Sequence, residues 1–553
     1  MSALYLALDT ALSRFGWVDR AAHVRIASLW VVATIAAAVL LVRLPTIAFS
    51  YVNVDEAVYT LIGTGLKTGQ IPYVDIVDRK PIGLFLIYAF AESFFRDGVI
   101  GPRILASIAT VLSGFGLYRF AERFLGIAQG AAIGGAVLFS TYGVLFGGDA
   151  AQAPVFYMPL VIAAAYLVAS NVERIVTGEI VQPYVIGAAG LMLGVALQIK
   201  PSMVFECVGF GCTLIAVGLL RRRTMSPRAQ VALVRGLVCM IAGGLLPTVI
   251  AGAAYAVLGH FDAWIFYNFT VNFLREESDY ARGAIVMRAA QFALCFTPLC
   301  ILAVAYARNA IATPQHARGG EARRWTHVLL AVWLVCALAG GLALRQPYGH
   351  YFYGVLGPLA ILAGAGLHRR DGVFLSLGGF AALVGVLALA CGAYAYGWRH
   401  EINKNGTPYL AYRMADDINR LDARSLYVFN QFGILYHLTG EPLPTKYPMP
   451  NHLLRELEAK SFRFDGKAEV ERILGDRPDT IVAMRPFTAM TAPDRVALLE
   501  ETLNASYCVW RTYPAGEHTV SVYRSTGPGG RGAGESCQNS DLMLADSGMD
   551  RRE

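Results

Sequence analysis

The sequence is poor in charged residues. Only 16% of its 553 residues are Asp, Glu, Lys or Arg, whereas 55% are hydrophobic, and the mean hydropathy is +0.46. This composition excludes a disordered chain and is too apolar for an ordinary soluble domain. The formal net charge of +7 arises in the apolar part of the chain, because the last 155 residues are slightly acidic. Such a basic excess is typical of membrane topology, so we expect no nucleic-acid partner.

Paired cysteine motifs are absent. Seven of the nine cysteines lie in apolar segments and none has CxxC spacing, so the sequence indicates neither a zinc site nor a disulfide framework. Cys508 and Cys537 are the only pair near the C-terminus, and the sequence leaves open whether they are bonded. The first 22 residues contain several charges and no small-residue cleavage site, so we expect no removable signal peptide.

Long apolar runs dominate the first 398 residues. A helix needs about 20 apolar residues to cross a bilayer. We predict eleven such spans: 27–48, 100–118, 126–146, 152–170, 184–199, 202–220, 236–258, 287–307, 327–344, 352–367 and 373–397. The shorter run from Ile82 to Phe95 is expected to lie at the outer surface, because a crossing there would place every later basic loop outside.

The same charge rule predicts which loops share the outer side. These are the first periplasmic loop, 49–99, the turns 147–152 and 345–351, Lys200-Pro201, segment 259–286 and the chain from Arg399. Residues 399–524 alternate strand-like and helix-like runs, which predicts a periplasmic α/β domain, and the Gly- and Ser-rich segment 525–553 is expected to be disordered. The predicted fold is mainly α, with a membrane domain of about 11 transmembrane helices over 1–398.

The first outer loop contains an acidic pair and a basic pair. It reads Asp55-Glu56, then Tyr59, then Gly69-Gln-Ile-Pro72-Tyr73-Val-Asp75, and finally Asp78-Arg79-Lys80-Pro81 before an apolar helix. This order suits acid–base chemistry beside a bound phosphate. The alternative is an ordinary solvated loop next to the membrane.

These motifs, in this order, resemble the first loop of polytopic glycosyltransferases of the GT-C superfamily, especially bacterial lipid A aminoarabinose transferases, rhizobial galacturonosyltransferases and relatives of protein O-mannosyltransferases. The resemblance implies that Asp55 is the catalytic acid/base, that Glu56 supports it, and that Lys80, with Arg79, binds the phosphate of a polyprenyl-phosphate sugar donor. A fixed cation there would stabilise the charge that the phosphate gains as the glycosidic bond breaks.

Four further residues are candidates for the site. Asp149 falls where the family often has a second acidic residue, although it could instead cap the next helix. Lys200 would contact the donor, unless it only pairs with Glu206 in the following helix. Arg345 and His350 lie in a turn that resembles the family's late His-Tyr motif, and we expect them to contact donor phosphate or sugar, while the neighbouring tyrosines anchor the membrane interface.

The predicted function is transfer of one sugar, with inversion, from a polyprenyl-phosphate donor to lipid A, lipopolysaccharide core or another envelope glycan. The enzyme would lie in the bacterial inner membrane with its active site in the periplasm; its partners would be the donor, a glycolipid or glycan acceptor and membrane lipids. The sequence defines no metal site, so a divalent cofactor stays open. The alternatives are a transporter or flippase of lipid-linked sugars, which predicts inverted repeats that are not apparent here, and a non-catalytic scaffold.

Overall fold

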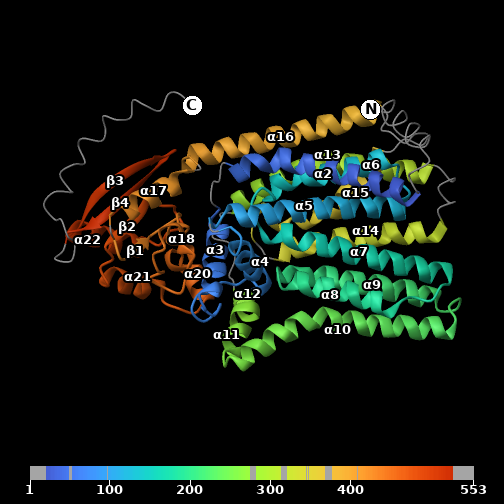
Figure 1. Ribbon diagram of the computed structural model, residues 1–553, viewed down its shortest axis with the longest axis horizontal. Coiled ribbons are helices and arrows are strands. Elements are labelled where there is room, and N and C mark those ends of the chain that lie inside the picture. The colour runs from blue at the N-terminus through green and yellow to red at the C-terminus, as the bar shows by residue number, and fades with distance from the viewer. Residues whose placement is uncertain are drawn as a thin grey trace.

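The computed structural model describes residues 20–48, 53–95, 97–274, 282–312, 320–343, 346, 348–367, 377–407, 409–421 and 423–526. The helices of the first part form a long bundle, and a small α/β part lies beyond one end of it (Figure 1). The bundle helices are α2 (Arg20–Ala48), α5 (Ile100–Phe120), α6 (Gln129–Gly143), α7 (Ala153–Thr177), α8 (Pro183–Leu197), α9 (Val204–Arg221), α10 (Pro227–Val257), α13 (Arg282–Ala312), α14 (Gly320–Ala343), α15 (Leu356–Gly366) and α16 (Leu377–Asn405).

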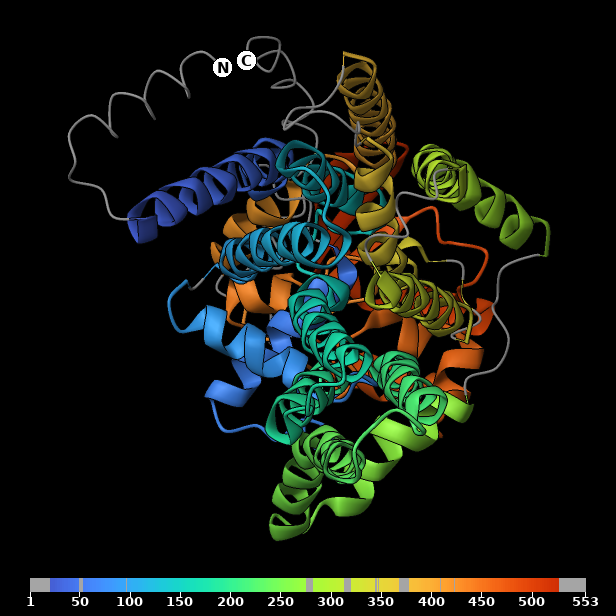
Figure 2. The ribbon, with the colours of Figure 1, turned by 90° about the vertical axis from the view of Figure 1, so that its right-hand side faces the viewer.

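Nine helices in the described part are long and apolar enough to cross a membrane. They coincide with nine of the eleven predicted spans, and the other two predicted spans, 184–199 and 352–367, correspond to the shorter helices α8 and α15. Figure 2 shows the bundle helices viewed nearly along their axes. Apolar side chains on the outside of the bundle are exposed, among them Val249 on α10 and Leu294 on α13 (60% and 72% exposed). Such surfaces are compatible with lipid contact, and the predicted fold class of a polytopic membrane bundle is confirmed.

Helices α8 and α10 approach each other through glycines. A methyl group added at Gly190 would lie 2.1 Å from the carbonyl oxygen of Met240, and one at Gly194 would lie 2.5 Å from that of Gly244. Small residues allow two backbones to come this close in a membrane, where packing replaces the hydrophobic effect. The apolar runs alone did not reveal this interface.

Two short helices, α3 (Val54–Lys67) and α4 (Ile82–Glu92), lie at the end of the bundle that faces the α/β part (Figure 1). Helix α4 has 11 residues, too few to span a bilayer, as expected for the run from Ile82 to Phe95. Helices α11 (Phe261–Ile265) and α12 (Val271–Leu274) lie at the same end, where the hydroxyl of Tyr73 lies 3.4 Å from the side-chain oxygen of Asn268.

The C-terminal part contains a four-stranded sheet of order β1-β2-β4-β3. Its strands are β1 (Leu426–Val428), β2 (Thr480–Arg485), β3 (Tyr507–Ala515) and β4 (His518–Ser525), and only β1 and β2 pair in parallel. Its helices are α17 (Leu410–Asn419), α18 (Leu435–Thr439), α19 (Pro450–Leu454), α20 (Glu456–Ser461), α21 (Gly466–Gly475) and α22 (Pro493–Ser506). The strand-like runs of the sequence, 426–430, 480–484 and 519–523, correspond to β1, β2 and β4. The sequence analysis missed β3, an edge strand that contains Pro514 and has an irregular register.

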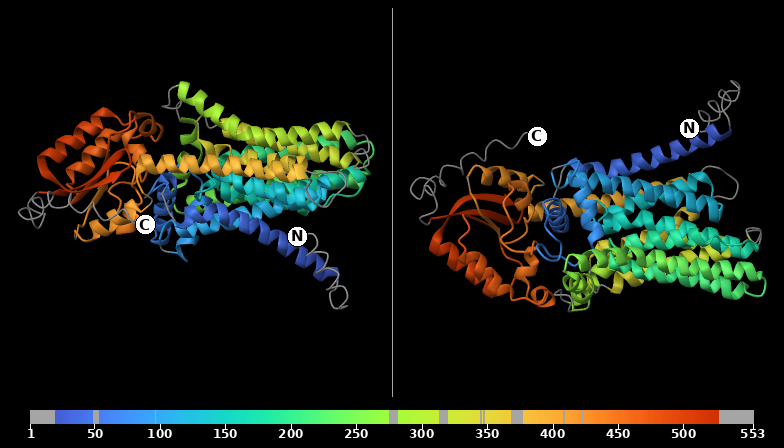
Figure 3. Two further views of the ribbon diagram at one scale, coloured as in Figure 1. Left: turned by 90° about the horizontal axis from the view of Figure 1, so that it is seen from above. Right: turned by 60° about the horizontal axis from the view of Figure 1, so that its bottom comes forward.

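The α/β part docks on α3, α4 and the loop between them, a placement that Figure 3 shows from two further sides. The backbone N–H of Val77 donates to the carbonyl of Lys446 at 2.9 Å. Arg79 forms an ion pair with Glu458 and lies over the ring of Phe462. Thr64 contacts His437 at 3.2 Å, and Nε2 of His437 lies 3.8 Å from a carboxylate oxygen of Glu92. The first loop is therefore packed between two layers of protein, and the solvated-loop alternative is wrong.

The cysteines follow the sequence analysis in part. The seven cysteines of the apolar segments are free. Cys508 is disulfide-bonded, while Cys537 and most of the segment predicted to be disordered lie outside the described residues. The boundary between the two predicted domains stays a prediction.

The glycine contact between α8 and α10 predicts a large effect of one methyl group. Gly190→Ala forces the two backbones apart and should lower the free energy of unfolding by about 1–3 kcal/mol, measured by thermal unfolding in detergent–lipid micelles. Gly211→Ala is the matched control, because no atom lies within 4 Å of the added methyl group. Equal stability of the two variants would contradict the packing argument.

The contact at Glu92 predicts a pH effect on stability. Burial and the charge of Asp97 raise the pKa of Glu92 from 4.5 to about 7, while Lys67 and His437 also face it. The folded protein thus holds this proton more tightly than the unfolded chain, so stability should fall as the pH rises from about 4.5 to about 7. Thermal unfolding of Glu92→Gln should be less pH-dependent across that interval, and parallel curves for variant and wild type would refute this.

Candidate active site

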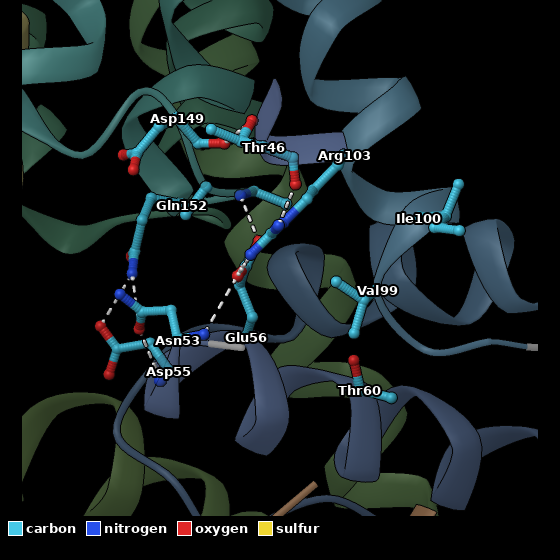
Figure 4. A network of polar contacts seen from close by, with 12 residues as sticks. Thr46, Asn53, Asp55, Glu56, Thr60, Val99, Ile100, Arg103, Asp149 and Gln152 are labelled. Atoms are coloured by element: carbon cyan, nitrogen blue, oxygen red, sulfur yellow. Dashed lines mark hydrogen bonds and ion pairs between the residues drawn. The ribbon is translucent and has the colours of Figure 1, made fainter. Parts of the chain in front are cut away.

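The first functional element is the start of helix α3, where Asn53 caps the helix. Its side chain accepts a hydrogen bond from the N–H of Asp55 at 2.9 Å, and the side chain of Glu56 accepts one from the N–H of Asn53 at 3.4 Å. This capping box fixes the helix start and turns the two acidic side chains in different directions. Figure 4 shows Glu56 pointing into the network and Asp55 lying at its edge.

Glu56 is 1% exposed and fully engaged. Arg103 on α5 donates to both of its carboxylate oxygens, at 3.0 and 2.6 Å, and the backbone N–H of Ala151 donates to Oε1 at 2.6 Å. With the N–H of Asn53, the carboxylate accepts four hydrogen bonds, which uses its capacity. The predicted supporting role of Glu56 therefore takes the form of a structural link between α3, α5 and the turn before α7.

Asp55 is only partly buried. Its Oδ2 accepts a hydrogen bond from the side-chain amide of Gln152 at 3.0 Å. Within the described ranges, its Oδ1 accepts no hydrogen bond from the protein. One oxygen of a firmly held carboxylate is thus available to a substrate, which is the arrangement that a general base requires.

Asp149 lies in the turn that joins α6 to α7. In Figure 4 its carboxylate points to the same side as that of Asp55, with Gln152 between them. Burial raises the pKa of Asp149, and the cations of Arg103 and Arg43 counter this effect. The cap of α7 is Gln152, so the capping role considered for Asp149 is wrong. The described residues contain no cluster of three metal-ligating side chains.

Lys200 is 3% exposed, and its ammonium group has no hydrogen-bond partner among the described residues. It lies 4.5 Å from the centre of the Tyr351 ring. The predicted alternative, an ion pair with Glu206, is absent from the described contacts. Burial, and next the positive charge of Lys80, lower the pKa of Lys200 well below its ordinary value, while the charges of Glu206 and then Asp55 act in the other direction. A buried amine without a hydrogen-bond partner is a candidate for binding an anion, because a nearby anion favours its charged form.

Lys80 follows Asp78, which is 4% exposed and accepts a hydrogen bond from the Lys80 N–H at 2.8 Å. The Lys80 ammonium group forms no ion pair with any residue that the structure describes. Its charge acts on Lys200 and on Asp78, so the two lysines share one electrostatic environment with Asp55. Arg79 differs from Lys80, because its Nη2 pairs with Glu458, while its buried Nη1 has no hydrogen-bond partner among the described residues. The predicted contact of Arg79 with the donor stays a prediction.

His350 lies against the turn before α7. A methyl group added at Gly147, whose φ is +76°, would lie 3.0 Å from the His350 Cβ. The imidazole stacks on Tyr348 and meets the edge of the Tyr351 ring. Tyr351 and Tyr353 are 7% and 1% exposed, so the predicted anchoring of these tyrosines at the membrane interface is wrong. Arg345 lies outside the described residues.

The sequence analysis missed Asn53, Arg103 and Gln152. Asn53 carried a detectable signal, because Asn followed three residues later by Glu is a capping pattern. Arg103 and Gln152 lie 47 and 97 positions from the acidic residues that they contact, so no local pattern could identify them.

The overall fold resembles those of solved membrane enzymes. The arabinofuranosyltransferase AftD from Mycobacteria aligns with a TM-score of 0.50 and 14% identity, over 90% of this chain and 40% of that one. The oligosaccharyltransferase AglB from Archaeoglobus fulgidus, in complex with an inhibitory peptide and a dolichol-phosphate, aligns with a TM-score of 0.46 and 10% identity, and its apo form with 0.47 and 11%; both cover 82% of this chain and 69% of that one. No protein-family model and no curated protein matches the chain.

The likeness to AftD shows a shared fold, and this chain spans about two fifths of the length of AftD. The GT-C type implied by the first-loop motifs stays a prediction at this level of likeness. The particular bacterial branch stays a prediction, as do the roles of the site residues.

The buried pair of Glu56 and Arg103 predicts a large difference between two Arg→Met substitutions. Arg103→Met leaves the Glu56 carboxylate buried without its cation and should lower the free energy of unfolding by about 3–5 kcal/mol. Arg123→Met is the matched control, because its ion pair with Glu173 is exposed and should contribute at most about 1 kcal/mol. Thermal unfolding of both purified variants measures this, and similar losses would show that the buried pair has no special role.

Proposed function

We propose that this protein is a membrane glycosyltransferase that transfers one sugar from a polyprenyl-phosphate donor to an acceptor at the outer face of a bacterial inner membrane. The observation that carries the proposal is one carboxylate, Asp55, in the same electrostatic environment as two unpaired lysines, Lys80 and Lys200. These residues lie at the end of a membrane bundle of GT-C type. A lipid-linked donor would place its phosphate at that depth, with its chain among the helices.

In the proposed reaction, Asp55 accepts a proton from the acceptor hydroxyl or amine through its free carboxylate oxygen. The acceptor atom attacks the anomeric carbon from the face opposite the phosphate, which inverts the configuration. The bond between the anomeric carbon and the phosphate oxygen breaks, and the electron pair leaves with the polyprenyl phosphate. Lys80 and Lys200 stabilise the negative charge that develops there, so they favour the transition state over the ground state.

Lys200 has a further consequence for donor binding. Burial disfavours its charged form in the free protein, and a nearby phosphate favours it. Donor binding would therefore be coupled to proton uptake at Lys200.

The acceptor would be lipid A, lipopolysaccharide core or another envelope glycan, because the first-loop motifs resemble those of bacterial lipid A aminoarabinose transferases and rhizobial galacturonosyltransferases. The α/β part lies at the end of the bundle that carries α3 and α4 (Figure 1). The α/β part packs on the first loop from the side away from the bundle, and we propose that it helps to shape the entrance for the acceptor. In the native membrane this side would be periplasmic, as the basic residues at the other loops indicate.

The proposal is tested by mass spectrometry of envelope glycolipids and glycans from a deletion strain that carries each of several variants. Wild type should restore a single missing sugar. Asp55→Asn should reduce its restoration by about 10²–10⁴-fold, because the general base is lost. Lys80→Met and Lys200→Met should weaken it through poorer use of the donor, while Lys446→Met, at an exposed lysine outside the site, should behave as wild type.

Full restoration by Asp55→Asn would overturn the catalytic assignment. A deletion strain that accumulates lipid-linked sugar on the cytoplasmic side would instead indicate a transporter. An unchanged envelope in the deletion strain would reject both enzyme and transporter and leave a scaffold.

A further inference from the structure

Gln152 occupies a fixed position between the acidic pair and the bundle. It occupies the N-cap position of helix α7, where its side chain forms no capping hydrogen bond, and it is 2% exposed. The preceding turn is held by Arg43 on α2, which donates to the carbonyl groups of Gly148 and Ala150, and by the N–H of Gly148, which donates to Gly143 at 2.7 Å. These hydrogen bonds fix the backbone that precedes Gln152.

Its side-chain amide closes a small ring of hydrogen bonds at the start of α3. Nε2 donates to Oδ2 of Asp55 at 3.0 Å and lies 3.4 Å from Oδ1 of Asn53. That oxygen of Asn53 in turn accepts from the N–H of Asp55 at 2.9 Å. Asp55 is thus held at its backbone by one amide side chain and at its carboxylate by another (Figure 4).

Two consecutive residues, Ala151 and Gln152, each donate a hydrogen bond to one member of the acidic pair. The backbone N–H of Ala151 holds Glu56 at 2.6 Å, and the side chain of Gln152 holds Asp55. The two carboxylates differ in whether a cation also binds them. Glu56 also receives the cation of Arg103, whereas the donor to Asp55 is neutral. A cationic partner would have formed a stronger, charge-assisted bond and reduced the basicity of the carboxylate.

We infer that Gln152 is a positioning residue for the proposed transfer: it fixes which oxygen of Asp55 faces the acceptor and leaves the negative charge of that carboxylate available as a base. The inference rests on the proposed function, in which Asp55 accepts the acceptor proton. Because α3 and α7 are rigid elements, the amide sets the direction of the free Oδ1. The geometry of proton transfer depends on this direction.

Other charged and titratable groups act on the same carboxylate and stay in place when Gln152 is changed. They are Lys200 in the connection between α8 and α9, Asp78 in the first loop, Tyr59 on α3 itself and Tyr88 on α4. A change in the pH profile between two variants at position 152 therefore reports the altered contact with Asp55.

The test compares Gln152→Met and Gln152→Lys in the purified full-length protein, reconstituted in lipid vesicles with the donor and acceptor identified by the strain experiment. Gln152→Met should lower kcat by about 10–100-fold with little change in the KM for the donor. The acid limb of its kcat–pH profile should move to higher pH, because the Gln152 amide, a hydrogen-bond donor that favours the ionised Asp55 carboxylate, is lost. Gln152→Lys should move the acid limb in the opposite direction, because a cation favours the ionised form.

Gln230→Met is the matched control. Its amide donates to the carbonyl groups of Arg222 and Met225, away from the site, so it should keep the wild-type kcat and pH profile. Thermal unfolding of all three variants separates loss of fold from loss of function.

Two results would overturn the inference: wild-type kcat in Gln152→Met, or an acid limb that stays the same in both variants at this position. Failure of the proposed function is distinguishable, because it would appear as retained transfer in Asp55→Asn or as no transfer by wild type. An unaffected Gln152→Met beside an inactive Asp55→Asn rejects the role of Gln152 alone.

Discussion

The site depends on one buried ion pair. Arg103 on α5 donates to both carboxylate oxygens of Glu56 on α3, and its Nη1 donates to the carbonyl of Thr46 at the end of α2. The same carboxylate accepts the N–H of Ala151 in the turn before α7. Two ions cannot be buried without such complete pairing, because desolvation would cost more than their attraction returns. The pair therefore specifies how four separate segments meet at the end of the bundle.

This arrangement separates two adjacent acidic residues that look equivalent in the sequence. The helix cap at Asn53 turns Glu56 inward, where its hydrogen-bonding capacity is used, and leaves Asp55 with a single neutral partner on one oxygen. Two nearby cations differ in their contacts. Arg79 forms an ion pair with Glu458 through Nη2, whereas the buried ammonium group of Lys200 has no hydrogen-bond partner among the described residues.

The α/β part completes this end of the bundle. It packs on the first loop through the hydrogen bond from the Val77 N–H to the Lys446 carbonyl, the Arg79 guanidinium over the Phe462 ring and the ion pair of Arg79 with Glu458. Its sheet is mixed, with β1 and β2 parallel and the other strand pairs antiparallel. The loop that carries Asp55 and Lys80 is therefore held from two sides, and residues held in this way can keep a fixed geometry close to the membrane surface.

The sequence by itself determined the membrane character, nine spans, the position of α4 and the residues of the first loop, because hydrophobic length and flanking charge act locally along the chain. It also predicted three of the four strands. The edge strand β3 escaped because its pattern is interrupted by Pro514 and an irregular register. The resemblance to GT-C enzymes rested on residues that are close together in the sequence.

Only the tertiary structure decided which charges are paired. The partners of Glu56, Asp55 and Arg79 lie 47, 97 and 379 positions away, and the glycine contact between α8 and α10 depends on the facing backbone. Such contacts have no local signature, because they arise from how whole helices pack. The separation of Glu56 as a structural residue from Asp55 as the available carboxylate is therefore a property of the packed bundle.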